Sequence, residues 1–135
     1  MKVSYHNHNQ ELTRTRDARK NWLDLLIEGA NPDYVEFILD TYWIVAGGAN
    51  PVDYIEKAKG MNHVLHFKDM GVDPETRTSI MTECGTGNLN FRDIIDACDR
   101  TGVVDALIEQ DIVTIDPFDS LAISFRNLTA IENEG

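Results

Sequence analysis

The sequence predicts an α/β fold built from four βα units of a TIM-type barrel, a half-barrel of parallel strands with outer helices. Four short, continuous apolar runs indicate strands that are buried on both faces. An amphipathic helical pattern follows each run, and the strand centres lie about 30 residues apart, as right-handed crossover connections require. No internal linker divides the 135 residues, so we expect residues 1–135 to form a single domain.

The predicted strands cover residues 3–8, 35–40, 63–68 and 106–109. Each of these runs ends in residues that can bind a divalent metal. Because parallel strands deliver their C-terminal residues to one face of a sheet, where α/β barrels keep their chemistry, we expect these ends to form one site.

The first predicted helix spans residues 14–28. Ala18, Trp22, Leu25 and Leu26 share one face of this helix at helical spacing, which predicts that they are buried. A following glycine and an Asn-Pro pair supply the stop signal.

The other helices are placed by the residues at their ends. Asn50 caps a helix that ends near Gly60, and Asn90 caps one that ends at Thr101. Asp116 and a following proline open the last helix, which we expect to bury one apolar side made of Leu121, Ala122, Phe125 and Leu128.

Composition excludes several classes of partner. The net charge of -11 repels phosphate backbones and anionic bilayers, so we expect no nucleic-acid and no membrane partner. No apolar run approaches the roughly 20 residues of a membrane-spanning helix. Cys84 and Cys98 form no CxxC pair and the start of the chain lacks the layout of a signal peptide, which predicts a reduced, cytoplasmic location.

The first strand ends in a histidine-rich segment. His6 and His8 point to the same side because side chains alternate along a strand, and Glu11 lies just beyond, within reach of the same centre. These three residues are candidates for metal binding or acid/base catalysis. The alternative is that one histidine forms a hydrogen bond within the core and that Glu11 is solvated.

The second strand ends in Asp40, directly after an apolar run. A carboxylate there is costly to bury without a cation or donors, so Asp40 is a candidate metal ligand. Its alternative role is to cap the following turn. Tyr42 and Trp43 are candidates for the wall of a substrate pocket, with simple packing as the alternative.

The last two strands supply the remaining candidates. His66 suits metal coordination, and Lys68 on the same face suits donation to a substrate oxygen. Glu109 ends its apolar run and is a candidate ligand, with Asp111 beside it as a supporting or loop residue. Two acids with histidines favour a hard or borderline divalent ion, with Mn²⁺ first and Mg²⁺ or Zn²⁺ as alternatives. The glycine turn at 83–88 is a weak signal for backbone contact with a ligand.

The chain resembles the xylose isomerase-like sugar phosphate isomerase/epimerase family of TIM barrels, and specifically the C-terminal half of that barrel. The resemblance rests on YHNHNQEL at 5–12, ILDTYWIVAGGANPVDYI at 38–55, HVLHFKDM at 63–70, GTGNLNF at 85–91 and ALIEQD at 106–111. It implies one divalent metal held by Asp40, His66, Glu109 and a fourth ligand, for which both His6 and Glu11 are candidates.

The resemblance also implies a reaction. A divalent-metal-dependent sugar or polyol isomerase or epimerase would act through an enediolate, with Lys68 stabilising its charge and His6 or His8 moving the proton. Trp43 and Asp111 are the expected substrate contacts. The alternatives are a dehydratase or lyase of a keto-sugar or inosose, and a catalytically inactive half-barrel that needs a partner. An apurinic-site endonuclease is disfavoured by 12 basic against 23 acidic residues.

The strand count predicts self-association. Four βα units leave two sheet edges unpaired, and exposed edges invite pairing with another chain. We therefore expect a homo-oligomer, a dimer that completes a barrel-like assembly.

Overall fold

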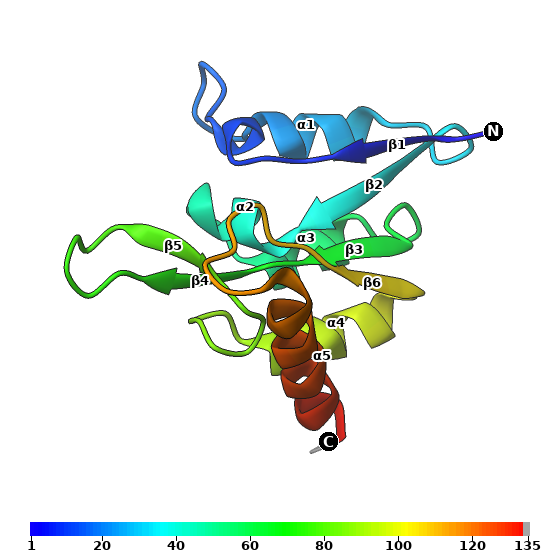
Figure 1. Cartoon of the computed structure of the whole chain (residues 1–135). Helices are drawn as coiled ribbons and strands as arrows, with labels where there is room; N and C mark the ends of the chain where they lie inside the picture. The colour runs from blue at the N-terminus through cyan, green and yellow to red at the C-terminus, as the bar shows by residue number, and fades with distance from the viewer. Residues whose placement is uncertain (134–135) are drawn as a thin grey trace.

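The computed structural model describes residues 1–133 and contains one four-stranded sheet (Figure 1). Its strands are β1 (Val3–His6), β2 (Val35–Asp40), β3 (Val64–Phe67) and β6 (Asp105–Ile108), arranged in that order. Each neighbouring pair is parallel. The predicted α/β fold of parallel strands is therefore confirmed.

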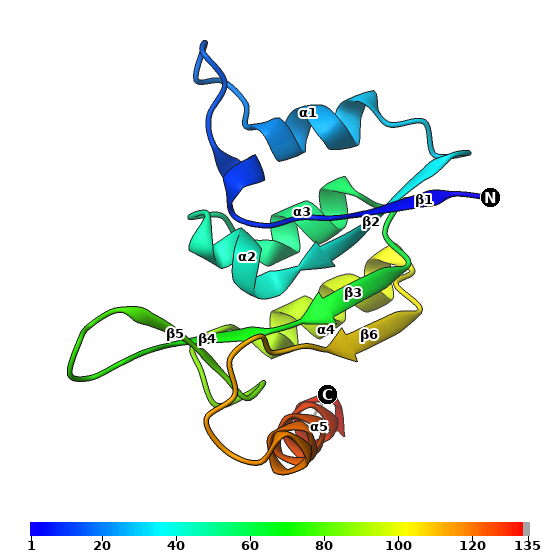
Figure 2. The same cartoon turned by 45° about the horizontal axis from the view of Figure 1, so that its top comes forward.

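Four helices line the outer side of this sheet. They are α1 (Trp22–Gly29), α3 (Pro51–Lys57), α4 (Phe91–Thr101) and α5 (Pro117–Asn133). Figure 2 shows α3 and α4 behind the strands, with α1 beyond β1 and α5 beyond β6. No helix of this described part of the chain is long and apolar enough to cross a membrane.

The first helix begins later than the sequence predicts. Residues 14–21 form a loop closed by a bridge between Arg14 and Asn21, and Asn21 then caps α1 in a reciprocal capping box with Asp24. The predicted buried face is also wrong. Leu23 and Ile27 face the core instead, while the side chains at 22, 25 and 26 are exposed.

Four elements were not predicted. A short 3-10 helix, η1 (Gln10–Leu12), follows β1, and α2 (Thr41–Ala46) follows β2 directly. After β3 the chain forms an antiparallel hairpin of β4 (Asp69–Val72) and β5 (Ser79–Thr82), which projects beyond the sheet in Figure 1.

The core lies between the sheet and the helices. It is built mainly from side chains of the inner strands and of the covering helices, among them Phe37, Leu39, Leu65, Phe67, Leu23, Ile55, Phe91 and Ile94. The prediction of strands buried on both faces is wrong for the edge strands, where Val3 and Leu107 are 64% and 50% exposed. Edge position explains the difference, because each edge strand has a neighbour on one side only.

The last helix buries a face that matches the predicted one only at Leu128, which packs partly buried against the core. Ser120 and Ser124 are buried, whereas Leu121 and Phe125 are exposed. Ser120 donates to Glu83 Oε1 at 2.9 Å, and the hydroxyl of Ser124 accepts the backbone N–H of the residue after Glu83. Hydrogen bonds to the glycine turn therefore set the rotation of α5.

Both cysteines are buried and free. Burial raises the pKa of Cys84 and the pKa of Cys98 to about 12. The two thiols therefore stay protonated at neutral pH.

Candidate metal centre

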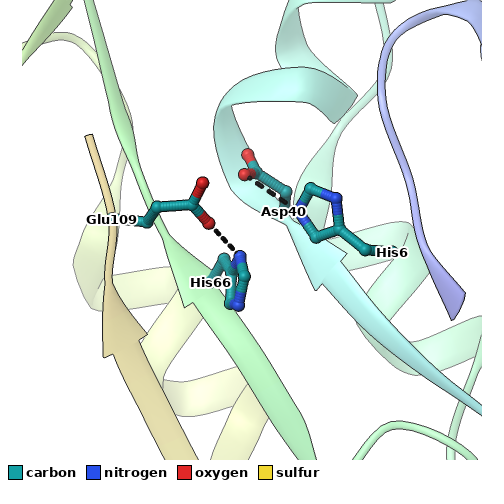
Figure 3. Close-up of side chains that lie close together, drawn as sticks. All are labelled: His6, Asp40, His66 and Glu109. Carbon is teal, nitrogen blue, oxygen red and sulfur yellow. Dashed lines mark hydrogen bonds and ion pairs between the residues drawn. The ribbon is translucent and has the colours of Figure 1, made fainter. Parts of the chain in front are cut away.

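Four side chains from the four strands of the sheet meet at the C-terminal ends of those strands (Figure 3). They are His6, Asp40, His66 and Glu109, and one ligand atom from each lies within 4.8 Å of all the others. His6 and Asp40 end β1 and β2, while His66 lies in β3 and Glu109 directly follows β6. The parallel register aligns Asp40 with His66, which brings the side chains to one level.

Two close contacts run through this cluster. His6 Nε2 lies 3.3 Å from Asp40 Oδ2, and His66 Nδ1 contacts Glu109 Oε2. Within residues 1–133, His66 Nδ1 and Glu109 Oε2 are buried and have no partner with the geometry of a hydrogen bond. Burial, opposed by the charge of Glu109, lowers the pKa of His66 and so favours the neutral imidazole that binds metals.

The cluster fits a divalent cation. Its donor set of two imidazole nitrogens and two carboxylates, from side chains that are buried or half-buried, could hold a divalent metal ion. Asp40 is completely buried. One of its carboxylate oxygens caps a helix and the other faces the cluster, which matches the two roles that the sequence suggested for it. Oδ1 accepts the backbone N–H of Trp43 at 3.0 Å and caps α2, whereas Oδ2 faces the cluster.

Lys68 lies beside the cluster and is only 1% exposed. Its Nζ lies 2.5 Å from Asp111 Oδ2, 3.5 Å from Glu109 Oε1 and 3.7 Å from Asp40 Oδ2. Burial alone lowers the pKa of Lys68, but the bond to Asp111 and the other carboxylates outweigh burial and raise it. The hydrogen bond from Lys68 in turn lowers the pKa of Asp111. Lys68 is therefore a buried cation.

Aromatic rings border the cluster on one side. The ring of Trp43 lies 5.2 Å from Lys68 Nζ and 5.1 Å from the ring of His8. Its indole Nε1 is buried and finds no hydrogen-bond partner in the described part of the chain. His8 is exposed, and its ring lies 5.0 Å from that of His6. Trp43 and His8 thus lie at the rim of the cluster.

Glu11 lies outside the cluster, in η1. Its carboxylate accepts hydrogen bonds from the hydroxyl of Tyr5 and from the backbone N–H of His8, each at 2.8 Å. Burial of the Glu11 carboxyl raises its pKa, but these hydrogen bonds outweigh that effect and lower the pKa. Burial of the Tyr5 hydroxyl, together with the nearby Glu11 carboxylate, raises the pKa of Tyr5 to about 12. Of the two candidates for the fourth ligand, His6 is the one that the structure brings into the cluster.

Sequence reasoning missed the residues that hold the strand ends in place. The hydroxyl of Thr41 donates to the carbonyl of Lys68 at 2.7 Å and accepts its N–H at 2.9 Å. Asn7 is fully buried and accepts the N–H of Asp40 at 3.0 Å. The alternation of side chains offered a signal for Asn7, because it must point away from the side that His6 and His8 share.

The glycine turn contacts a carboxylate of its own chain. The N–H groups of Gly85 and Gly87 each donate to Asp69 Oδ2 at 2.9 Å, and that of Leu89 donates to Oδ1 at 3.2 Å. Asp69 follows Lys68 directly and is fully buried. The turn therefore anchors the end of β3 and the base of the hairpin.

Several solved structures are similar to this chain. A sugar phosphate isomerase/epimerase from Parabacteroides distasonis is 28% identical with a TM-score of 0.68, and the match covers 94% of this chain and 44% of that one. The chain has the fold of half a sugar phosphate isomerase/epimerase barrel. The resemblance predicted from the sequence, and the half-barrel it implies, are confirmed.

Two further structures share the fold of this half-barrel. A xylose isomerase domain protein from Planctomyces limnophilus is 17% identical, with a TM-score of 0.70 and coverage of 99% of this chain and 46% of that one. The probable 3-DHS dehydratase AsbF from Bacillus anthracis is 23% identical, with a TM-score of 0.67 and coverage of 100% and 50%. The half-barrel thus spans about half the length of the solved structures it matches. No family model and no curated protein matches it.

Proposed function

We propose that this half-barrel is the metal-binding part of a divalent-metal-dependent sugar or polyol isomerase or epimerase. The observation that carries the proposal is the meeting of four ligand atoms within 4.8 Å at four adjacent parallel strand ends. Such a rim is where barrels of this kind place their reacting groups. The similarity to a sugar phosphate isomerase/epimerase supports the reaction class.

His6, Asp40, His66 and Glu109 would hold the ion, with Mn²⁺ as the first choice and Zn²⁺ or Mg²⁺ as alternatives. When bound, the ion supplies Lewis-acid polarisation of a substrate carbonyl and of the hydroxyl beside it. Glu11 keeps its bonds in η1 and takes no part as a ligand.

The surrounding side chains would move the proton and bind the sugar. Lys68 is protonated and donates to the substrate oxygen that gains negative charge in the enediolate, while Asp111 orients Lys68. His6 is committed as a ligand, so His8 at the rim is the residue that takes the proton from carbon and returns it. Trp43 forms one wall of the sugar site and offers its free indole N–H to a hydroxyl.

A dehydratase or lyase is the second candidate. The same proton abstraction followed by loss of a neighbouring hydroxyl gives an unsaturated product, and the similarity to the probable 3-DHS dehydratase favours this outcome. A third possibility is a half-barrel that binds metal and is inactive without a partner that supplies further substrate contacts. The cytoplasmic location and the homo-oligomer predicted from the sequence remain part of this proposal.

Metal titration of matched histidine variants tests the metal site. We expect one Mn²⁺ per chain by calorimetry and elemental analysis, and a loss of affinity of about 100-fold or more in His66→Ala, because a direct ligand is removed. His63→Ala is the control, since His63 precedes β3 and its ring pairs loosely with Glu36 at 3.8 Å. Full stoichiometry and unchanged affinity in His66→Ala would remove the assignment.

Exchange of deuterium from solvent tests the reaction class. The Mn²⁺-loaded chain is incubated in D₂O with ketoses, inososes and 3-keto-glycosides, and mass spectrometry locates the label. Label at the carbon beside the carbonyl, reduced in Lys68→Met, supports the isomerase or epimerase. A product that is lighter than its substrate by one water identifies the dehydratase. Metal binding without exchange on any of these compounds points to the inactive half-barrel.

A further inference from the structure

Both outer edges of the four-stranded sheet are unpaired within residues 1–133, and exposed apolar side chains flank each of them. The β1 edge surface comprises Val3, Trp22, Leu25 and Leu26, which belong to β1 and α1. The β6 edge surface comprises residues of β6, α5 and the connection between them, namely Leu107, Ile112, Phe118, Leu121 and Phe125. Unpaired strands beside exposed apolar surface are interaction sites.

Segments of opposite charge border the two edge surfaces. The loop at 14–20, which precedes α1, contains Arg14, Arg16, Arg19 and Lys20 against one acid, Asp17, a local charge of +3 in a chain of net charge -11. The start of α5 instead carries two exposed acids, Asp116 and Asp119. The β1 edge surface is therefore basic at one end, and the β6 edge surface is acidic at one end.

The topology places these charged segments at the same level. The loop at 14–20 lies on the path from the C-terminal end of β1 to α1, and Asp116 lies on the path from the C-terminal end of β6 to α5. Both are on the side of the sheet where the strands end and where the metal cluster lies. When β1 of one chain runs parallel to β6 of another, the basic loop meets the acidic start of α5, and α1 packs along α5.

We propose that two copies of this chain associate through these surfaces, with the β1 edge surface of each copy against the β6 edge surface of the other. A two-fold axis makes the contact twice and closes an eight-stranded barrel that has no free edge. The inference rests on the self-association included in the proposed function, and it adds the faces, the strand direction and the charge pairing. His6 ends one edge strand and Glu109 directly follows the other, so the second copy would also cover the open side of the cluster.

Measuring mass in solution across a concentration series, without metal, tests the closed pair. We expect the 15.2 kDa chain to form a species of twice that mass. Arg16→Glu and Asp119→Arg are each expected to weaken the dimer by about tenfold or more, because each places like charges together at two equivalent contacts. The combined variant, Arg16→Glu with Asp119→Arg, is expected to bind within about threefold of the wild type, because the opposite charges are restored.

The control is Glu75→Lys on the exposed hairpin turn, which changes the net charge as much as Asp119→Arg does, away from both edge surfaces. Circular dichroism verifies that each variant is folded. A monomer would overturn the proposed self-association. A dimer that neither single charge reversal weakens, or that the combined variant does not restore, would overturn the assigned faces. Species larger than a dimer would overturn the closed eight-stranded barrel. The metal titration of His66→Ala is read separately, so failure of the dimer and failure of the metal site are distinguishable.

Discussion

Lys68 Nζ lies 3.7 Å from Asp40 Oδ2, the same oxygen that lies 3.3 Å from His6 Nε2. A buried ammonium group therefore shares a carboxylate oxygen with the candidate metal centre. The positive charge of Lys68 compensates part of the negative charge of Asp40, Glu109 and Asp111 when no cation is bound.

Replacing this cation should destabilise the metal-free chain. Lys68→Met leaves three carboxylates without their partner and is expected to lower the free energy of unfolding by about 2–3 kcal/mol, less than for a fully buried pair because the side chain of Asp111 is 45% exposed. Mn²⁺ should then raise the melting temperature of the variant more than that of the wild type. Lys59→Met, at an exposed lysine, is the control; equal metal-induced shifts in both variants would contradict the shared-carboxylate interpretation.

The hydroxyl of Thr41 should matter more than an ordinary buried hydroxyl. Thr41→Val removes both bonds to the backbone of Lys68 and is expected to cost about 1–3 kcal/mol and to weaken Mn²⁺ binding about 10- to 100-fold. Thr82→Val is a matched control, because the buried hydroxyl of Thr82 lacks a hydrogen-bond partner over residues 1–133. Urea unfolding and calorimetry measure the two effects, and similar results for both variants would show that Thr41 does not position the site.

The glycine turn should not tolerate a side chain at Gly87. A Cβ atom there would lie 2.5 Å from Thr82 Oγ1, 2.6 Å from Asp69 Oδ1 and 2.6 Å from the carbonyl of Met70. Gly87→Ala is expected to destabilise the fold by about 1–3 kcal/mol through overpacking and disturbed bonds to Asp69. Gly29→Ala, where a Cβ meets nothing within 4 Å, should be neutral or stabilising in thermal unfolding. Equal stability of the two variants would contradict this view of the turn.

The ion pair between Asp24 of α1 and Lys57 of α3 should make the free energy of unfolding depend on pH. Burial raises the pKa of Asp24, but Lys57, the N–H of Asn21 and the hydroxyl of Tyr54 outweigh burial and lower it. Because the folded pKa is depressed, the stabilisation is complete above the unfolded pKa of about 3.9 and is lost as pH falls through the lowered folded value. Urea unfolding between pH 7 and pH 3 should show a smaller loss for Asp24→Asn than for the wild type, whereas the control Asp33→Asn should follow the wild type.

Much of the architecture could be predicted from the sequence because burial leaves a plain pattern. The four apolar runs and the caps at Asn50, Asn90 and Asp116 located the sheet and most helix starts, since each depends on residues adjacent in sequence. The start of α1 was wrong because residues 14–20 carry a helix-like pattern, while the decisive interaction is the capping box between Asn21 and Asp24.

The rest depends on contacts between distant residues. The rotation of α5 is set by bonds from Ser120 and Ser124 to residues near 83, and these cannot be read from the amphipathic pattern of the helix. The choice between His6 and Glu11 has the same origin. Tyr5 and the backbone of η1 hold Glu11 away from the cluster, a packing result that strand alternation does not reveal.

The burial of Cys84 and Cys98 makes the chain ready for site-specific labelling. Each thiol is protonated and shielded, so maleimide reagents should leave the natural sequence almost unmodified under native conditions. One added cysteine, for example Glu75→Cys, would then carry a fluorophore alone, and energy transfer between labelled copies could follow assembly in real time without removing either native sulfur.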